Sequence, residues 1–157
     1  MSKKQGSPIS ERMMWMAVLV AGLGYFVDVF DMWLFSNYRL ASLKELGLSP
    51  EEITIVGAKL LNFQLIGFLV GGFIWGILGD KQGRAKVMFG SIFLYSTATL
   101  LNAFVTTIPQ YAAARFFGGI GLAGEIGAGI TLVSELLPNR MRGWGTTFVT
   151  ALGVAGA

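Results

Sequence analysis

The segment LLNFQLIGFLVGGFIWGILG, residues 60–79, is twenty residues long and contains no charged side chain. A helix that crosses a bilayer needs about 20 mainly apolar residues, because the hydrocarbon core is roughly 30 Å thick. The segment VMFGSIFLYSTATLLNAFVTTI, residues 87–108, meets the same condition and is also uncharged. These two segments predict a protein that is embedded in a membrane.

Three further apolar segments flank these two. Residues 13–38 and 109–138 are long enough to span a bilayer, although both contain ionisable side chains. The last segment, residues 144–157, would reach only about 21 Å as a helix, which is too short to span. We therefore expect an all-α membrane protein with four complete transmembrane helices and a truncated fifth, over residues 13–38, 54–79, 87–108, 109–138 and 144–157.

One helix start can be read from a local pattern. Ser49 is followed by Pro50, Glu51 and Glu52. Serine is a preferred N-cap, proline suits the first helical position, and acids in the first turn interact favourably with the helix dipole. The helix that contains residues 60–79 is therefore expected to begin near Pro50, outside the membrane.

The composition excludes several classes of function. Hydrophobic residues make up 54% of the 157-residue chain and charged residues 13%, whereas a soluble domain has roughly 25% charged residues. Cysteine and histidine are both absent, which excludes disulfides, thiol nucleophiles, His-based triads and metal sites built from these residues. We expect no metal, no cofactor and no enzyme activity, since no serine has an evident base.

The cations indicate how the chain lies in the membrane. Eight of them fall in three segments that the predicted helices place on one side: Lys3, Lys4 and Arg12, then Lys81, Arg84 and Lys86, then Arg140 and Arg142. Cytoplasmic loops carry an excess of Lys and Arg. We therefore expect residues 1–12 to be a cytoplasmic tail in a multi-pass inner-membrane protein. The net charge of +3 is a topology signal and does not indicate a nucleic-acid partner. A cleaved signal peptide is the alternative interpretation of the N-terminus, but no A-x-A-like cleavage site is evident.

Four ionisable residues lie inside predicted membrane helices: Asp28, Asp31, Arg115 and Glu125. Such residues are costly in hydrocarbon and mark functional sites by default. Asp31 and Arg115 fall at similar depth, about 10 and 9 Å from the same predicted membrane face, whereas Asp28 and Glu125 fall near the midplane. We hypothesise that Asp31 and Arg115 form a proton-titratable pair, and that Asp28 and Glu125 line a central site. The alternative is a static ion pair that fixes helix packing.

Polar and small residues in the same helices admit two interpretations. Asn62, Gln64, Tyr95 and Asn102 are candidates to line a substrate cavity, although such residues often form hydrogen bonds between helices instead. Glycines recur at four-residue spacing, as at Gly67 and Gly71. This spacing is typical of helices whose backbones approach closely.

The connection between the second and third predicted helices carries a specific motif. It reads GILGDKQGRAK and resembles the signature loop of the major facilitator superfamily, G-x-x-x-D-R/K-x-G-x-x-R/K, at every defined position: Gly76, Asp80, Lys81, Gly83 and Lys86. Arg84 occupies a variable position of the same loop. It lies on the predicted cytoplasmic side, as the family's loop does. Arg115, Gly119 and Gly121 resemble the family's R-x-x-x-G-x-G motif.

Two further patterns resemble particular branches of this family. Residues 134–143, SELLPNRMRG, resemble the E-x-x-P-x-x-x-R-G segment of sugar porters and related metabolite symporters. Asp28 and Asp31 resemble the D-G-F-D pattern of aromatic-acid and organic-acid proton symporters, with Val29 in place of glycine.

The resemblance implies a twelve-helix fold of two six-helix halves that rock about a midplane site. The chain would be the N-terminal portion, without the C-terminal half. The resemblance also implies a cytoplasmic gate in which Glu135 and Arg142 join Asp80 and Arg84. The function expected is proton-coupled uptake of an organic acid or sugar by alternating access. The partners are then the small-molecule substrate, H⁺ (or Na⁺), the bilayer and the missing half. A proton-coupled exporter and a small membrane scaffold are the alternatives.

Overall fold

The computed structural model describes residues 11–157, and within that range the regular structure is entirely helical. The helices are α1 (Glu11–Glu45), α2 (Pro50–Gln82), α3 (Arg84–Asn102), α4 (Ile108–Leu136) and α5 (Arg142–Val154). The expected all-α class is confirmed. Most of the expected cytoplasmic tail, residues 1–10, lies outside the described residues.

Three of these helices are long and apolar enough to cross a membrane: α1 from Met14 onward, α2 and α4. The sequence predicted four. Helix α3 ends at Asn102 instead of residue 108, and its 19 residues would extend about 28 Å. The reason is local, because Thr106 donates its backbone N–H to the side chain of Gln110 at 3.2 Å and Pro109 occupies the first turn of α4. The expected number of complete spans, four, therefore exceeds by one the number of described helices that are long and apolar enough to span.

The other helix ends follow recognisable local chemistry. Helix α1 continues seven residues beyond the expected position 38 and stops before Gly47, whose φ of +83° favours glycine. Helix α2 begins at Pro50, as expected, with a capping box in which Ser49 and Glu52 satisfy each other's backbone N–H groups. Gly83, with φ +91°, separates α2 from α3 and allows the sharp turn between them.

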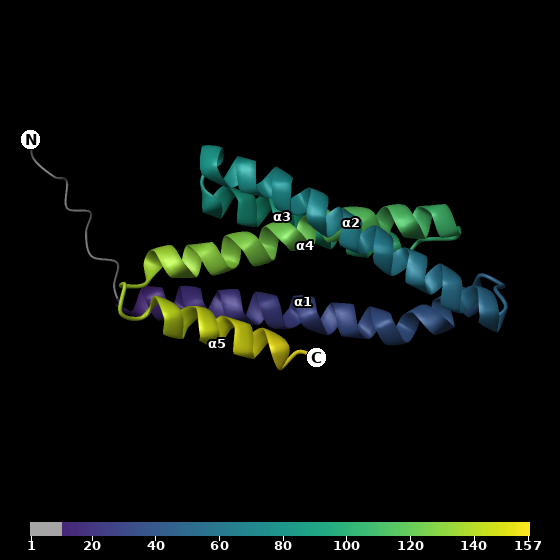
Figure 1. The fold of residues 1–157 in the computed structure, drawn as a ribbon, viewed down its shortest axis with the longest axis horizontal. Helices are drawn as coiled ribbons and strands as arrows, with labels where there is room; N and C mark the ends of the chain where they lie inside the picture. The colour runs from purple at the N-terminus through teal and green to yellow at the C-terminus, as the bar shows by residue number, and fades with distance from the viewer. Residues whose placement is uncertain (1–10) are drawn as a thin grey trace, which may run out of the picture.

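Helix α4 occupies the centre of the bundle (Figure 1). It packs most extensively on α2 and α3, while α1 packs mainly on α5. The beginning of α1, the α2–α3 turn and the α4–α5 turn lie at one end of the bundle (Figure 1). The two turns with predicted cytoplasmic cations are therefore at the same end, as the sequence analysis requires.

Glycine allows the backbones of α2 and α4 to touch. Any Cβ atom at Gly67 would collide with the carbonyl oxygen of Phe116, and one at Gly71 would lie 2.6 Å from the carbonyl oxygen of Ile120. From the opposite side, a Cβ atom at Gly119 would collide with the carbonyl oxygen of Gln64. The expected close packing of small residues is thus observed at this crossing.

Two apolar clusters close the ends of the bundle. The cluster nearer the α1–α2 turn comprises Phe35, Leu43, Ile53, Leu60 and Tyr111. The cluster nearer the α4–α5 turn comprises Val18, Val133, Leu137 and Val149. Asp28 and Asp31 of α1 and Arg115 and Glu125 of α4 lie along their helices between the two clusters.

The glycine crossing predicts a contrast between two alanine substitutions. Gly119→Ala should lower the thermal unfolding midpoint in detergent, because overpacking costs roughly 1–3 kcal/mol. The control is Gly72→Ala, since a Cβ atom there would meet nothing within 4 Å. The control should leave the midpoint unchanged or raise it slightly. Equal midpoints for the two variants would show that the crossing does not depend on glycine.

Candidate functional site

Asp28 and Glu125 line one cavity between the helices of the bundle. The cavity has a volume of ≈ 120 Å³, and its walls come from α1, α3, α4 and α5. Asp28 is 2% exposed, and its Oδ2 atom has no hydrogen-bond partner. A Cβ atom at Gly24 would lie 3.2 Å from Oε1 of Glu125, so this carboxylate lies against the backbone of α1. No cation is among the described residues that line the cavity.

Asp31 lies on the same helix but lines a different pocket. This second pocket has a volume of ≈ 360 Å³ and is formed by α1, α3 and α4. The hydroxyl group of Tyr95 donates a hydrogen bond of 2.7 Å to Oδ2 of Asp31. Tyr95 approaches α4 closely, because a Cβ atom at Gly121 would lie 2.6 Å from its backbone nitrogen. Three residues of spacing along α1 therefore separate the two aspartates into two sites.

Arg115 lines the same pocket as Asp31 without forming an ion pair with it. The ion pairs found within residues 11–157 do not include Arg115. Its Cζ atom lies 3.6 Å from the ring centroid of Phe35 and 5.8 Å from that of Tyr111. Its Nε atom is buried and has no hydrogen-bond partner. Asp31 and Arg115 therefore form no direct ion pair in this structure: Tyr95 holds the carboxylate, and the guanidinium lies beside two aromatic rings. Their role as a proton-coupling pair stays a prediction.

The four polar residues proposed to line a cavity separate into two groups. Tyr95 contacts Asp31, and Asn102 lines the pocket that contains Asp31 and has a buried Oδ1 atom without a partner. Asn62 is exposed on the surface of the described chain. Gln64 is buried at the α2–α4 crossing and lines neither pocket. The structure thus groups two of the four with the ionisable residues, and their roles in substrate binding stay predictions.

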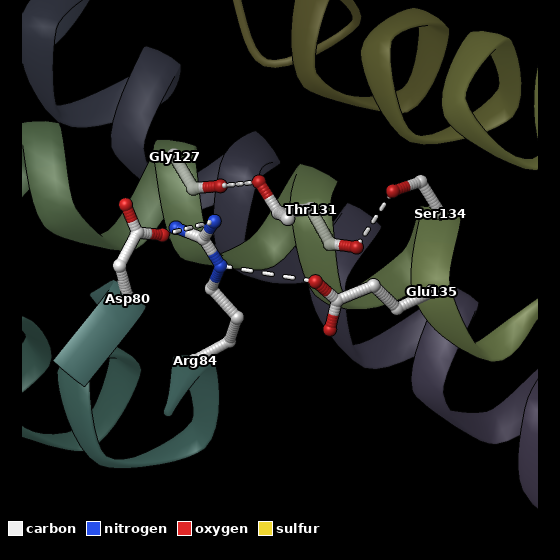
Figure 2. A network of polar contacts seen from close by, with 6 residues as sticks. All are labelled: Asp80, Arg84, Gly127, Thr131, Ser134 and Glu135. Atoms are coloured by element: carbon white, nitrogen blue, oxygen red, sulfur yellow. Dashed lines mark hydrogen bonds and ion pairs between the residues drawn. The ribbon is translucent and has the colours of Figure 1, made fainter. Parts of the chain in front are cut away.

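The signature loop forms a small charge network with α4 (Figure 2). Arg84 donates from Nη2 to Oδ1 of Asp80 at 3.0 Å, and its Nε atom lies 3.8 Å from Oε1 of Glu135. The side chains of Asp80 and Glu135 are 74% and 56% exposed, whereas that of Arg84 is 29% exposed. Arg84 therefore joins the end of α2 to the end of α4, and the acids remain accessible. Asp80 is thus paired locally, with a residue four positions along the chain.

Other residues of the motif lie outside this network. Arg142 does not join it, contrary to the expectation from the resemblance, because its Nε atom donates to the carbonyl oxygen of Leu137 at 3.1 Å and caps the end of α4. Lys81 and Lys86 are exposed. Gly76 lines a pocket beside Arg84, and a Cβ atom there would meet nothing within 4 Å. Only the turn at Gly83 has a backbone conformation that explains the glycine of the motif.

Sequence reasoning missed the side chains that hold these charges. A Cβ atom at Gly79 would lie 2.8 Å from Nη1 of Arg84, so this glycine makes room for the guanidinium. Trp75, whose indole donates to the carbonyl oxygen of Ile120 at 2.7 Å, binds α2 to α4. One signal was available for Tyr111, since it precedes Arg115 by four residues and so shares its helix face. Phe35 follows Asp31 by four residues and so shares its helix face, which is a comparable signal.

Comparison with known proteins agrees with the motif. The family model described as Major Facilitator Superfamily matches residues 21–157. A protein from Bacillus subtilis that has the name NiaP is 37% identical over 143 residues, which cover 91% of this chain and 34% of that protein.

Two further relatives have names that state a substrate. The niacin transporter NiaP of Acinetobacter baylyi is 32% identical over 124 residues, 79% of this chain and 27% of the relative. The cis,cis-muconate transport protein of the same species is 32% identical over 165 residues, 99% of this chain and 39% of the relative.

The chain thus spans about a third of the length of these relatives. The names of the two Acinetobacter baylyi relatives describe transporters. This agrees with the expectation that the chain is not an enzyme. The family match covers the signature loop and the residues Asp28, Asp31, Arg115 and Glu125. It also covers α2 and α4 completely and most of α1, which are the three helices long and apolar enough to span. The chain therefore belongs to the major facilitator superfamily and is a multi-pass membrane protein.

Proposed function

We propose that this chain forms part of a secondary active transporter that takes up a small polar metabolite together with protons by alternating access. Family membership and the names of the relatives support the transport role. The relatives named for niacin and for cis,cis-muconate suggest an organic acid in preference to a sugar. The cations at one end of the bundle support an inner-membrane location with that end in the cytoplasm.

The observation that carries proton coupling is the pair of acids in the central cavity. Asp28 of α1 and Glu125 of α4 line the same cavity. No cation among the described residues lines it. Two carboxylates that share an apolar site do not both ionise readily, because their charges repel and both lose hydration. A proton held between them would join α1 to α4, and its release would separate the two helices. Na⁺ could be held by the same oxygen atoms, so the experiment must separate the two ions.

Asp31 and Arg115 take part in this proposal through their shared pocket and not through a contact. Protonation of Asp31 removes the one negative side chain among the described residues that line the pocket, and thereby leaves the charge of Arg115 uncompensated. The hydrogen bond from Tyr95 to Asp31 can persist in both states, because a protonated carboxyl group still offers an acceptor oxygen. The charge of the pocket would therefore change with little movement of its walls.

The network at the end of α2 is proposed to act as the cytoplasmic gate. Arg84 pairs with Asp80 and Glu135 and lines the same pocket as Gly76 and Thr131. Lys81 and Lys86 are exposed beside it and would interact with the bilayer surface or with the other half of the transporter. Exposed ion pairs contribute about 0.2–1 kcal/mol each, which suits a gate that must open and close.

Asp28→Asn should abolish proton-driven accumulation while leaving substrate exchange intact, since exchange needs no net proton movement. The measurement uses vesicles that contain the complete transporter, with nicotinate and cis,cis-muconate as probes, under an imposed proton gradient and separately under a Na⁺ gradient. Glu51→Gln, an exposed acid at the start of α2, is the matched control and should accumulate normally. Normal accumulation by Asp28→Asn would exclude a coupling role for this carboxylate.

Asp80→Asn should open the proposed gate. The chain has no cysteine, so Thr131→Cys, in the pocket that Arg84 also lines, can be labelled specifically with a membrane-impermeant maleimide. We expect Asp80→Asn to raise the labelling rate from the cytoplasmic side several-fold in the complete transporter, because Arg84 loses its shorter ion pair. Glu51→Gln again serves as the control. An unchanged rate would mean that Asp80 does not restrict access to this pocket.

A further inference from the structure

Exposed aromatic rings gather where the start of α1 meets the start of α5. The rings of Trp15 and Trp144 meet edge to face with their centroids 6.4 Å apart, and Phe148 stacks on Trp144 at 6.0 Å. All three side chains are exposed, that of Trp144 at 66%. These three rings, which we call the aromatic cluster, therefore join two helices and still leave much of their surface uncovered.

Arginines lie at the same end of these two helices. Arg12 is the second residue of α1 and precedes Trp15 by three residues, so the two share a helix face. Arg140 lies in the α4–α5 turn, and Arg142 is the first residue of α5. The start of α1 and this turn lie together at one end of the bundle (Figure 1). All three arginines are exposed, so the aromatic cluster is bordered by positive charge.

No described acid neutralises the arginines at the start of α5. The ion pairs among the described side chains are those of Arg84, and neither includes Arg140 or Arg142. Helix α5 also has no acid in its first turn. A cation beside the N-terminus of a helix is unfavourable, because this end of the helix dipole is positive. An anion from outside the described chain would therefore complement this surface.

The order of residues along α1 matches the layers of a membrane surface. The apolar span begins at Met14, so Arg12 lies outside it and Trp15 at its edge. One turn deeper are exposed apolar side chains, Leu19 on α1 and Phe148 on α5. A phospholipid has the same order of phosphate, interface and acyl chain, and tryptophan prefers the interface. A protein partner would have to match all three layers, whereas the phospholipids of the bilayer already do.

We propose that the starts of α1 and α5 together bind an anionic phospholipid, with its phosphate against the arginines and an acyl chain along the aromatic cluster. Arginine suits this role because its parallel N–H donors match two phosphate oxygens. Helix α1 packs mainly on α5, and one lipid bound to both would anchor this pair of helices at the membrane surface. The site shares no residue with the cavity of Asp28 or the network of Arg84, so it does not depend on the proposed transport function.

The test is the quenching of tryptophan fluorescence by phosphatidylglycerol with brominated acyl chains, in nanodiscs that contain the complete transporter. Brominated phosphatidylcholine, which has no net charge, is the comparison lipid. We expect stronger quenching by the phosphatidylglycerol. This excess should disappear in Trp15→Phe combined with Trp144→Phe, because these rings would contact the bound lipid. Trp33→Phe, which removes an exposed tryptophan farther along α1, is the matched control and should keep the excess.

Charge variants measure the preference for the anionic lipid. Arg12→Gln combined with Arg140→Gln should lower the binding of phosphatidylglycerol relative to phosphatidylcholine about tenfold or more, since each cation beside an anionic surface contributes roughly fivefold. Arg12→Lys combined with Arg140→Lys keeps the charge and should retain most of the preference. Lys44→Gln combined with Lys59→Gln removes two exposed cations elsewhere and should change nothing. Arg142 is left intact because it also caps α4.

Several results would overturn the inference. One is equal quenching by the two brominated lipids, and another is an excess that survives in the double glutamine variant of Arg12 and Arg140. Equal losses in that variant and in the lysine control would show a general effect of net charge in place of a site. Absence of any quenching at Trp15 and Trp144 would show that another part of the transporter covers the cluster. Circular dichroism must confirm that each variant keeps its helices.

Discussion

The cost of placing charged groups in hydrocarbon is the constraint on which this structure depends. Insertion scales assign roughly 2.5–3.5 kcal/mol to a charged side chain at the centre of a membrane helix. This chain places Asp28, Asp31, Arg115 and Glu125 inside the predicted membrane segments of two helices, α1 and α4. The bundle meets the cost by turning all four toward cavities between helices, where Asp28 faces Glu125 and Asp31 shares a pocket with Arg115. Neither arrangement is a direct ion pair of the kind that would hold the helices rigidly together.

Glycine determines which helix provides the fixed frame. Close backbone contacts at Gly67, Gly71 and Gly119 lock α4 onto α2, and Gly121 brings α4 against α3. Helix α1 is in closer association with α5 than with α4. Helix α4 also packs much less on α1 than on α2 and α3. The acids of α1 and the ionisable residues Arg115 and Glu125 of α4 therefore lie where the packing between α1 and the frame is sparse. A change of protonation at this boundary would act where the packing resists movement least.

The two sites and the gate are arranged along α4. Arg115 lies near its beginning, Glu125 near its middle and Glu135 near its end. One helix thus connects the pocket of Asp31 and Arg115, the proposed proton cavity and the charge network of Arg84 (Figure 2). Displacement of α4 relative to α1 would act on the pocket of Asp31 and on the cavity of Asp28. The network of Arg84 lies within the frame of α2, α3 and α4 and would move with that frame. This arrangement is consistent with the way inverted repeats and rocking bundles expose a midplane site to one side at a time.

The sequence by itself determined the membrane class, the approximate spans, the start of α2 after Ser49, and which ionisable residues lie within the apolar helices. It could do so because apolar length, capping residues and intramembrane charge are local properties of the chain. The tertiary structure decided the partners. Depth along the helix placed Asp31 level with Arg115, but helix rotation and crossing gave Asp31 to Tyr95 and Arg115 to Phe35, and directed Arg142 to the carbonyl of Leu137. Depth follows from counting residues at a fixed rise, whereas lateral neighbours depend on how close glycine lets each pair of helices approach, and only the packed bundle fixes that distance.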